Sequence, residues 1–119
     1  MSDAKTYTGS CHCGNVRFHV TAALDKAITC NCSMCSRAGY VLSFVPPEAF
    51  TLDQGEDSLS DYQFGAKNIH HLFCSNCGVR SFGRGAGPDG TEMVAINLRC
   101  LDDLDLASVP TAEFDGKSL

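Results

Sequence analysis

The sequence lacks a long hydrophobic run. Its longest apolar stretch without a charged residue covers residues 40–47, which is far shorter than the roughly 20 residues of a membrane-spanning helix. Residues 1–10 also lack the apolar block of a secretory signal peptide. We therefore expect a cytoplasmic protein with no membrane partner.

Basic residues are scarce as well. Lysine and arginine together number 9 against 14 for aspartate and glutamate, so the formal net charge is -5. The few basic side chains are scattered along the chain, whereas a protein that binds nucleic acid presents a basic face to the phosphates. The sequence therefore predicts no nucleic-acid partner.

The sequence also lacks the periodicity of amphipathic helices. Apolar residues at spacings i, i+3, i+4 and i+7 do not persist over ten residues, although residues 35–39 and 47–50 can each form one helical turn. The patterns typical of strands occur in five segments, which are 16–20, 40–45, 62–64, 68–73 and 94–98. A chain of 119 residues encloses one core. We therefore expect a mainly β fold and a single domain over residues 1–119.

Eight cysteines stand out in a chain that shows no export signal. A reducing compartment keeps thiols from pairing, so this density favours metal binding over a disulfide scaffold. The cysteines form three clusters and one outlier, which are Cys11-x-Cys13, Cys30-x-Cys32-x-x-Cys35, Cys74-x-x-Cys77 and Cys100.

The clusters have short spacings that let neighbouring thiolates bind one ion. In Cys74-x-x-Cys77 the two-residue gap followed by Gly78 is typical of a tight knuckle, because glycine adopts backbone conformations that are awkward for other residues. On an extended strand, residues i and i+2 point to the same face, so cysteines separated by a single residue can also share a metal. His12, which lies between two such cysteines, would then point away from the metal.

Counting ligands leaves several groupings open. Structural zinc sites are closed by four ligands, whereas catalytic sites keep three protein ligands and one open position. One grouping gives a closed site of Cys11, Cys13, Cys74 and Cys77 and an open site of Cys30, Cys32 and Cys35. A second grouping combines Cys11 and Cys13 with Cys30 and Cys32, which leaves Cys35, Cys74, Cys77 and Cys100. A third grouping closes the triplet with Cys100 or with one of the histidines His12, His70 and His71.

Four segments carry a more specific pattern. They are GSCHCGNVRF at residues 9–18, CNCSMC at 30–35, FCSNCGV at 73–79 and VAINLRC at 94–100. In this order the motifs resemble the glutathione-dependent formaldehyde-activating (GFA) family, the centromere-protein-V/GFA domain, and the resemblance extends over residues 8–116. One departure is Arg80-Ser81, where many relatives carry His-Pro or a similar pair before the phenylalanine.

The resemblance implies a β-tent fold of antiparallel sheets pinned by zinc. It also implies two zinc ions per chain: a structural ion on Cys11, Cys13, Cys74 and Cys77, and a second ion on Cys30, Cys32 and Cys35 with an open fourth position. Characterised relatives are described as condensing formaldehyde with glutathione, and the family is classed with the carbon-sulfur lyases for the reverse cleavage. The implied partners are therefore a small thiol such as glutathione and an aldehyde.

This chemistry suits a three-thiolate zinc site. A thiol bound to zinc loses its proton near neutral pH, and the thiolate is the form that adds to an aldehyde carbon. Three thiolates make zinc a weak Lewis acid, which favours exchange of a soft sulfur ligand over hydrolysis. No carboxylate lies beside the triplet, so the proton acceptor must be water or a group distant in sequence. Our leading hypothesis is a zinc-dependent carbon-sulfur lyase, and the competing hypothesis is a non-catalytic zinc-stabilised β module that binds a protein or small-molecule partner.

Three residues are candidates for substrate contact, namely Ser33, Arg37 and Asn97. Each has a simpler alternative: a turn hydroxyl for Ser33, a solvated guanidinium for Arg37, and hydrogen bonds to backbone groups for Asn97. His70 and His71 point to opposite faces of a predicted strand, so at most one of them can face inward. Three phenylalanines are expected in the core, which are Phe44, Phe73 and Phe82.

Overall fold

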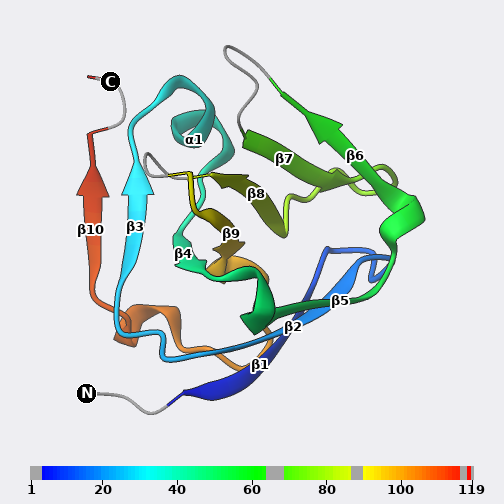
Figure 1. The fold of residues 1–119 in the computed structure, drawn as a ribbon, viewed down its shortest axis with the longest axis horizontal. Coiled ribbons are helices and arrows are strands. Elements are labelled where there is room, and N and C mark those ends of the chain that lie inside the picture. The colour runs from blue at the N-terminus through cyan, green and yellow to red at the C-terminus, as the bar shows by residue number, and fades with distance from the viewer. Residues whose placement is uncertain (1–3, 64–68, 87–89, 116–117, 119) are drawn as a thin grey trace.

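A computed structural model describes residues 4–63, 69–86, 90–115 and 118 (Figure 1). Strands dominate this part of the chain, so the predicted mainly β fold is confirmed. The strands are β1 (Lys5–Ser10), β2 (Arg17–Ala22), β3 (Ala27–Cys30), β4 (Leu42–Val45), β5 (Phe50–Gln54), β6 (Leu59–Tyr62), β7 (Ile69–Cys74), β8 (Phe82–Ala86), β9 (Glu92–Asn97) and β10 (Thr111–Phe114). The helical elements are α1 (Ser33–Ala38) and the 3-10 turns η1 (Pro47–Ala49), η2 (Glu56–Ser58), η3 (Leu98–Cys100) and η4 (Leu106–Ser108). Residues 64 and 68, predicted at the ends of two strands, lie outside the described residues.

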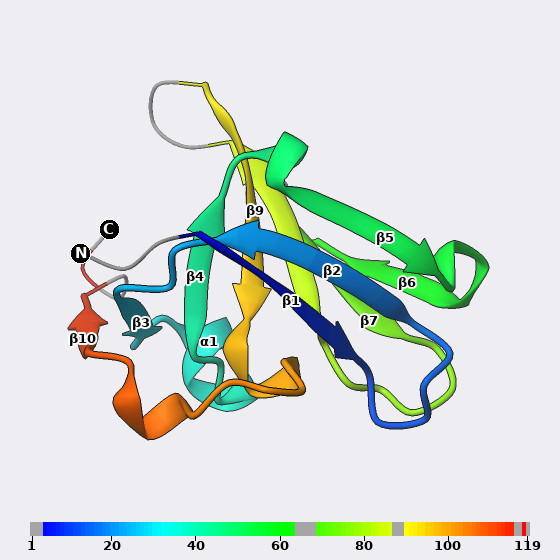
Figure 2. The same ribbon diagram turned by 90° about the horizontal axis from the view of Figure 1, so that it is seen from below.

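The described strands form two sheets. The smaller sheet has the order β1-β2-β5 and the larger one the order β10-β3-β4-β9-β8-β7-β6. Every pair is antiparallel except β10 and β3, which run parallel at an edge of the larger sheet, so the sheets are antiparallel as expected apart from this one pair. Figure 1 shows β10 beside β3, and Figure 2 shows β1, β2 and β5 as a layer of their own. No helix in the described part of the chain is long and apolar enough to cross a membrane.

Three aromatic rings join the two sheets. Phe18 of β2 and Phe50 of β5 belong to the smaller sheet, and Phe82 of β8 belongs to the larger one. The ring centroids of Phe50 and Phe82 lie 4.6 Å apart, and those of Phe18 and Phe50 lie 5.5 Å apart. All three side chains are buried, so the core lies between the sheets, and the prediction that Phe82 belongs to the core is confirmed.

The predicted strands differ from the observed ones at their ends. Segment 16–20 lies mostly in β2, where the buried side chains of Phe18 and Val20 alternate with more exposed neighbours. Segment 94–98 is one residue too long, because Leu98 begins η3. Its side chain is still buried, which explains why it continues the apolar pattern.

Both expected helical turns are present. The turns predicted at residues 35–39 and 47–50 correspond to α1 and η1. Helix α1 begins earlier than expected, at Ser33, because the Sγ of Cys32 accepts a hydrogen bond from the backbone N of Cys35 at 3.3 Å and caps the first turn. This cap fixes two cysteines of the CNCSMC motif relative to each other.

Candidate functional site

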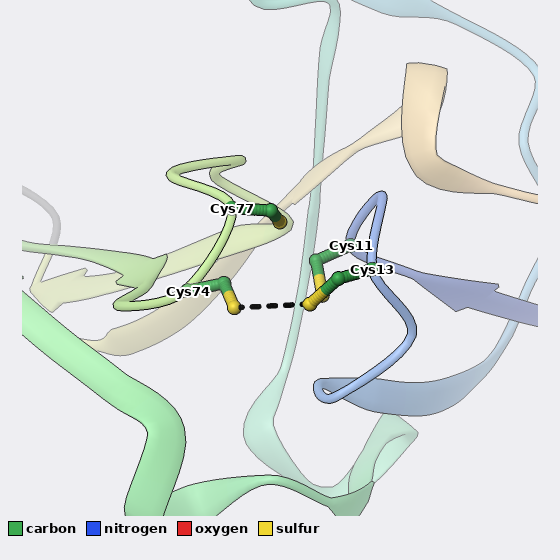
Figure 3. A group of neighbouring side chains, drawn as sticks. All are labelled: Cys11, Cys13, Cys74 and Cys77. Carbon is green, nitrogen blue, oxygen red and sulfur yellow. Dashed lines mark hydrogen bonds between the residues drawn. The ribbon is translucent and has the colours of Figure 1, made fainter.

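Four thiols from two loops converge between β1 and β7 (Figure 3), and they belong to Cys11, Cys13, Cys74 and Cys77. All four Sγ atoms lie within 4.8 Å of one another. The Sγ of Cys13 is 3.7 Å from that of Cys11 and 3.6 Å from that of Cys74. A zinc ion bound tetrahedrally by thiolates at about 2.3 Å separates its sulfur ligands by about 3.8 Å. The sulfur spacing therefore fits a four-thiolate zinc site.

Tight turns bring these thiols together. Strand β7 ends at Cys74, whose carbonyl accepts a hydrogen bond from the backbone N of Gly78 at 2.8 Å. Gly78 has a φ of 80°, so the predicted knuckle and its need for glycine are confirmed. The expectation of an extended strand at Cys11 and Cys13 is wrong, because β1 ends before them and the backbone N of Gly14 donates to the carbonyl of Cys11 at 3.3 Å. This turn, rather than strand alternation, brings the first two thiols together.

The four thiols differ in how readily they ionise. Burial raises the pKa of Cys11 to about 11. The backbone N–H groups of Cys13 and Val79 lower the pKa of the Cys77 thiol to about 6, because they stabilise its thiolate. A hydrogen bond with Asn76 contributes most to the lowered pKa of Cys13. Hydrogen bonds thus favour the thiolate forms of Cys13 and Cys77, which metal binding requires. The buried thiol of Cys11 would need the positive charge of a metal ion to lose its proton.

A second cluster consists of Cys30, Cys32 and Cys35, whose Sγ atoms also lie within 4.8 Å of one another. Cys30 ends β3, Cys32 is the N-cap of α1 and Cys35 lies in the first turn of the helix. In the described residues, no fourth cysteine, histidine or carboxylate joins this group. The cysteines therefore group as the resemblance implies, into one cluster of four and one cluster of three. The structure forms neither of the two alternative groupings.

The outlying thiol and the histidines are engaged elsewhere. The Sγ of Cys100 lies 3.9 Å from the carbonyl oxygen of Arg80, to which it donates. His12 is exposed in the loop after β1. His70 pairs through Nδ1 with the carboxylate of Asp61 at 2.6 Å. None of these side chains is part of the three-cysteine cluster.

The thiols of the three-cysteine cluster also differ in their pKa values. Burial raises the pKa of Cys35 to about 12, and the neighbouring Cys32 adds to the effect. Burial also opposes ionisation of Cys32, but hydrogen bonds from the backbone N–H of Cys35 and from the adjacent thiols outweigh it, so the pKa of Cys32 is lowered. The helix cap therefore favours ionisation of Cys32 over that of Cys35.

The triplet lies in the wall of a cavity of about 530 Å³. The lining residues come from six of the seven strands of the larger sheet, from α1 and from the residues beside them, and they are Ile28, Cys30, Cys32, Met34, Cys35, Tyr40, Leu42, Phe44, Ile69, His71, Phe82, Gly83, Ala95, Asn97 and Phe114. No cysteine of the four-thiol cluster lines this cavity. The two clusters thus have different surroundings, since only the triplet adjoins space for a ligand of this size.

The three predicted substrate contacts have different positions. Ser33 and Arg37 are exposed on α1 and do not line the cavity. The guanidinium of Arg37 donates to the carbonyl of Ser33 at 2.9 Å, and the side chain that caps α1 is that of Cys32. Asn97 does line the cavity, but both polar atoms of its side chain bind backbone groups. Of the three residues, Asn97 alone lines the cavity, and substrate contact by any of them stays a prediction.

Two phenylalanines lie where the sequence did not predict them. Phe44 is 49% exposed and lines the cavity, so its assignment to the core is wrong. Phe73 is half-buried, and the guanidinium carbon of Arg80 lies 5.2 Å from its ring centroid. At Arg80 the sequence departs from that of many relatives, and the structure shows this cation stacked on aromatic rings near the cavity.

Two polar groups of the cavity wall belong to Tyr40, which the sequence did not single out, and to His71. Burial raises the pKa of Tyr40, an effect that the charge and hydrogen bond of Arg80 oppose. Burial lowers the pKa of His71, and the charge of Arg80 lowers it further. Of the two histidines, at most one of which was expected to face inward, His71 lines the cavity and His70 does not.

Comparison with known proteins agrees with this architecture. Residues 6–115 match the family model of the glutathione-dependent formaldehyde-activating enzyme. The fold is also similar to the crystal structure of a Rhodobacter sphaeroides protein determined in a structural genomics programme, with a TM-score of 0.76 and 29% sequence identity over 88% of this chain and 99% of that chain. The match extends over nearly the whole sequence and includes both cysteine clusters. The chain therefore belongs to the glutathione-dependent formaldehyde-activating enzyme family, as its motifs predicted.

Proposed function

We propose that the chain is a single cytoplasmic zinc-binding domain that acts as a carbon-sulfur lyase. It forms or cleaves an adduct between glutathione, or another small thiol, and formaldehyde or a related aldehyde. The observation that carries this proposal is the position of the three-cysteine cluster in the wall of the cavity, whereas the four-cysteine cluster does not line it. Membership of the family supports the choice of reaction.

In this proposal the four-cysteine cluster holds a structural zinc ion. Its thiols come from the loop after β1 and from the turn after β7, so one ion would tie the smaller sheet to the larger one. Four thiolates complete the coordination of zinc and leave no position for substrate. The role of Cys11, Cys13, Cys74 and Cys77 is then to stabilise the fold.

The three-cysteine cluster would hold the second zinc ion. Cys30, Cys32 and Cys35 supply three thiolates, and the fourth position is left for the sulfur of a substrate. When bound, zinc supplies a lowered pKa for a coordinated thiol, which makes the thiolate available near neutral pH. The cap of α1 keeps the protein thiols in place, and the cavity receives the remainder of the substrate.

The bond changes need no further reactant. The thiol sulfur adds to the aldehyde carbon, the carbonyl electron pair moves to oxygen, and that oxygen takes up the proton released by the thiol. Cleavage is the reverse. Among the described lining residues, Tyr40 carries the one hydroxyl group, and we assign its Oη to donate a hydrogen bond to the aldehyde oxygen. A tyrosine hydroxyl is protonated near neutral pH, as a donor must be, and burial raises the pKa of Tyr40 further above its ordinary value.

Zinc stoichiometry and turnover together test the proposal. Reduced, zinc-equilibrated wild-type protein should hold two zinc ions per chain, and Cys35→Ser should hold one while retaining its circular dichroism spectrum. Carbon-13 NMR with labelled formaldehyde would then measure adduct formation with glutathione and with 2-mercaptoethanol above the uncatalysed rate. Wild type should accelerate the reaction with at least one of them, and Cys35→Ser should not. A single zinc ion in both proteins, or rates equal to the uncatalysed reaction, would favour a zinc-stabilised binding module.

A further inference from the structure

The cavity beside the three-cysteine cluster is almost entirely apolar, and its chemistry points to a substrate. We propose that this site takes a thiol with an apolar body, alkyl or aromatic, in preference to glutathione, together with the aldehyde adduct of that thiol. The inference rests on the proposed lyase function, because it assigns the substrate class of the same site. The apolar body is the part of the thiol that takes no part in the bond changes.

The wall opposite and around the thiols is built from hydrocarbon and aromatic side chains. They come from six different strands and from α1, and they include Ile28, Met34, Leu42, Phe44, Phe82 and Phe114. The three cysteines of the triplet belong to the same lining. A ligand that binds through sulfur therefore has apolar surface available for the atoms attached to that sulfur. The cavity volume lies in the range of sites that enclose a drug-sized ligand.

The mouth of the cavity is apolar too. Among the described residues, the large hydrophobic side chains that are exposed are Phe44, Tyr62, Ile69 and Phe114, and all but Tyr62 line the cavity. Single exposed apolar side chains are common, but a group of them around one cavity marks a site that binds an apolar partner. Because they come from β4, β7 and β10, the fold rather than one apolar segment assembles them.

Glutathione carries two carboxylates and an ammonium group, and these charges need partners or water. No lysine, arginine, aspartate or glutamate occurs among the described residues that line the cavity. The amide of Asn97 is already bound to backbone groups. Arg80 does not line the cavity, and its guanidinium lies over the rings of Tyr62 and Phe73 and hydrogen-bonds to Tyr40. Placing unpaired charges against this wall would be unfavourable. An apolar body instead gains from leaving water.

Binding measurements test the preference without relying on turnover. Isothermal titration of zinc-loaded, reduced protein would compare 2-phenylethanethiol, 2-mercaptoethanol and glutathione. We expect 2-phenylethanethiol to bind at least tenfold more tightly than either of the others. Equal or weaker binding of 2-phenylethanethiol, or no binding of any thiol, would overturn the inference. Tighter binding of 2-phenylethanethiol without turnover of any thiol would support the inference and contradict the lyase function.

A charge introduced at the mouth provides a matched comparison. Phe44→Arg should weaken 2-phenylethanethiol binding at least fivefold and strengthen glutathione binding, because it replaces apolar surface with a partner for carboxylates. Thr51→Arg adds the same charge at an exposed position of β5 that does not line the cavity, and it should change neither affinity. If Phe44→Arg does not fold, Phe44→Ser should still weaken 2-phenylethanethiol binding. Unchanged affinity in a folded Phe44 variant would contradict the inference.

Discussion

The side-chain amide of Asn97 donates a hydrogen bond to the backbone carbonyl of Arg80, with 2.9 Å between Nδ2 and O. Its Oδ1 accepts from the backbone N of Arg99 at 3.2 Å. Asn97 is buried at the end of β9, and Arg80 precedes β8, so one side chain links the ends of two neighbouring strands at the cavity wall. Asn97 therefore has a positioning role next to the proposed active site.

Replacing Asn97 by alanine should lower the free energy of unfolding by about 1–3 kcal/mol, because the change removes two hydrogen bonds to backbone groups near the core. Urea unfolding monitored by circular dichroism would measure the loss. Asn15→Ala, at an exposed position, is the control and should stay within about 0.5 kcal/mol of wild type. Equal effects of the two changes would show that the amide of Asn97 contributes little.

Phe18→Ala should lower the free energy of unfolding by about 3–5 kcal/mol, because Phe18 is 1% exposed and packs between the two sheets. Phe44→Ala removes the same side chain from the mouth of the cavity, where half of it is already exposed, and should cost less than about 1 kcal/mol. Chemical denaturation of both variants measures the contrast. A comparable loss at both positions would contradict the assignment of Phe44 to the cavity rather than the core.

Gly55 should tolerate a methyl group worse than Gly39. Both have positive φ values, 96° and 72°, so alanine is strained at either position by roughly 1–2 kcal/mol. A Cβ at Gly39 meets nothing within 4 Å, whereas one at Gly55 would overlap the backbone carbonyl of Asn15. Gly55→Ala should therefore lose at least about 1 kcal/mol more than Gly39→Ala, since the loops must also move apart. Thermal denaturation compares the two, and equal midpoints would refute the close approach.

Loss of the proposed structural zinc should destabilise the protein more than loss of the second ion. Zinc at 100 times its dissociation constant contributes about 2.7 kcal/mol by linkage. At about 4 °C per kcal/mol, Cys77→Ser should therefore lower Tm by about 10 °C or more. Cys35→Ser affects a cluster within one segment of the chain and should lower Tm by less. Differential scanning calorimetry with and without a chelator measures both effects. A larger loss for Cys35→Ser would reverse the proposed roles.

The stability of the wild-type protein should fall in mildly acidic solution partly through His71. Burial holds the pKa of His71 below its ordinary value of 6.5, so the unfolded chain takes up the proton at a higher pH than the folded one. Stability should therefore decline as the pH falls below about 6.5. His71→Gln removes this contribution and should flatten the decline. Urea unfolding between pH 8 and 5 measures the difference between the two proteins, which cancels any contribution from metal release, and identical slopes would contradict the expectation.

Much of the metal chemistry could be predicted from local sequence. The knuckle at Cys74 and Cys77 was recognised because a two-residue gap and a following glycine fix the turn within a few residues. The turn at Cys11 and Cys13 was predicted as a strand, since single-residue spacing does not distinguish the two. Spacing also left three groupings of the cysteines open, and the resemblance to the GFA family favoured the one that the structure forms.

The cavity could not be predicted in the same way. The run that ends in β4 is apolar on both faces, so its pattern did not reveal that Val45 faces the core while Phe44 lies at the cavity. Tyr40 and His71 lie on segments far apart in the sequence, and neither segment carries a signal that they share a wall. Such relationships depend on which strands become neighbours.

The sequence by itself determined the strand-rich character of this protein and the identity of the thiols that can bind metal, because alternation and turn spacing act over a few residues. Tertiary structure decided which thiols meet, which of the two clusters adjoins a cavity, and which aromatic side chains surround that cavity. These depend on the order of the strands in two sheets and on the burial of Phe18, Phe50 and Phe82 between them. The physical reason is that the core gains stability from contacts between distant segments, and the position of the site follows from that packing.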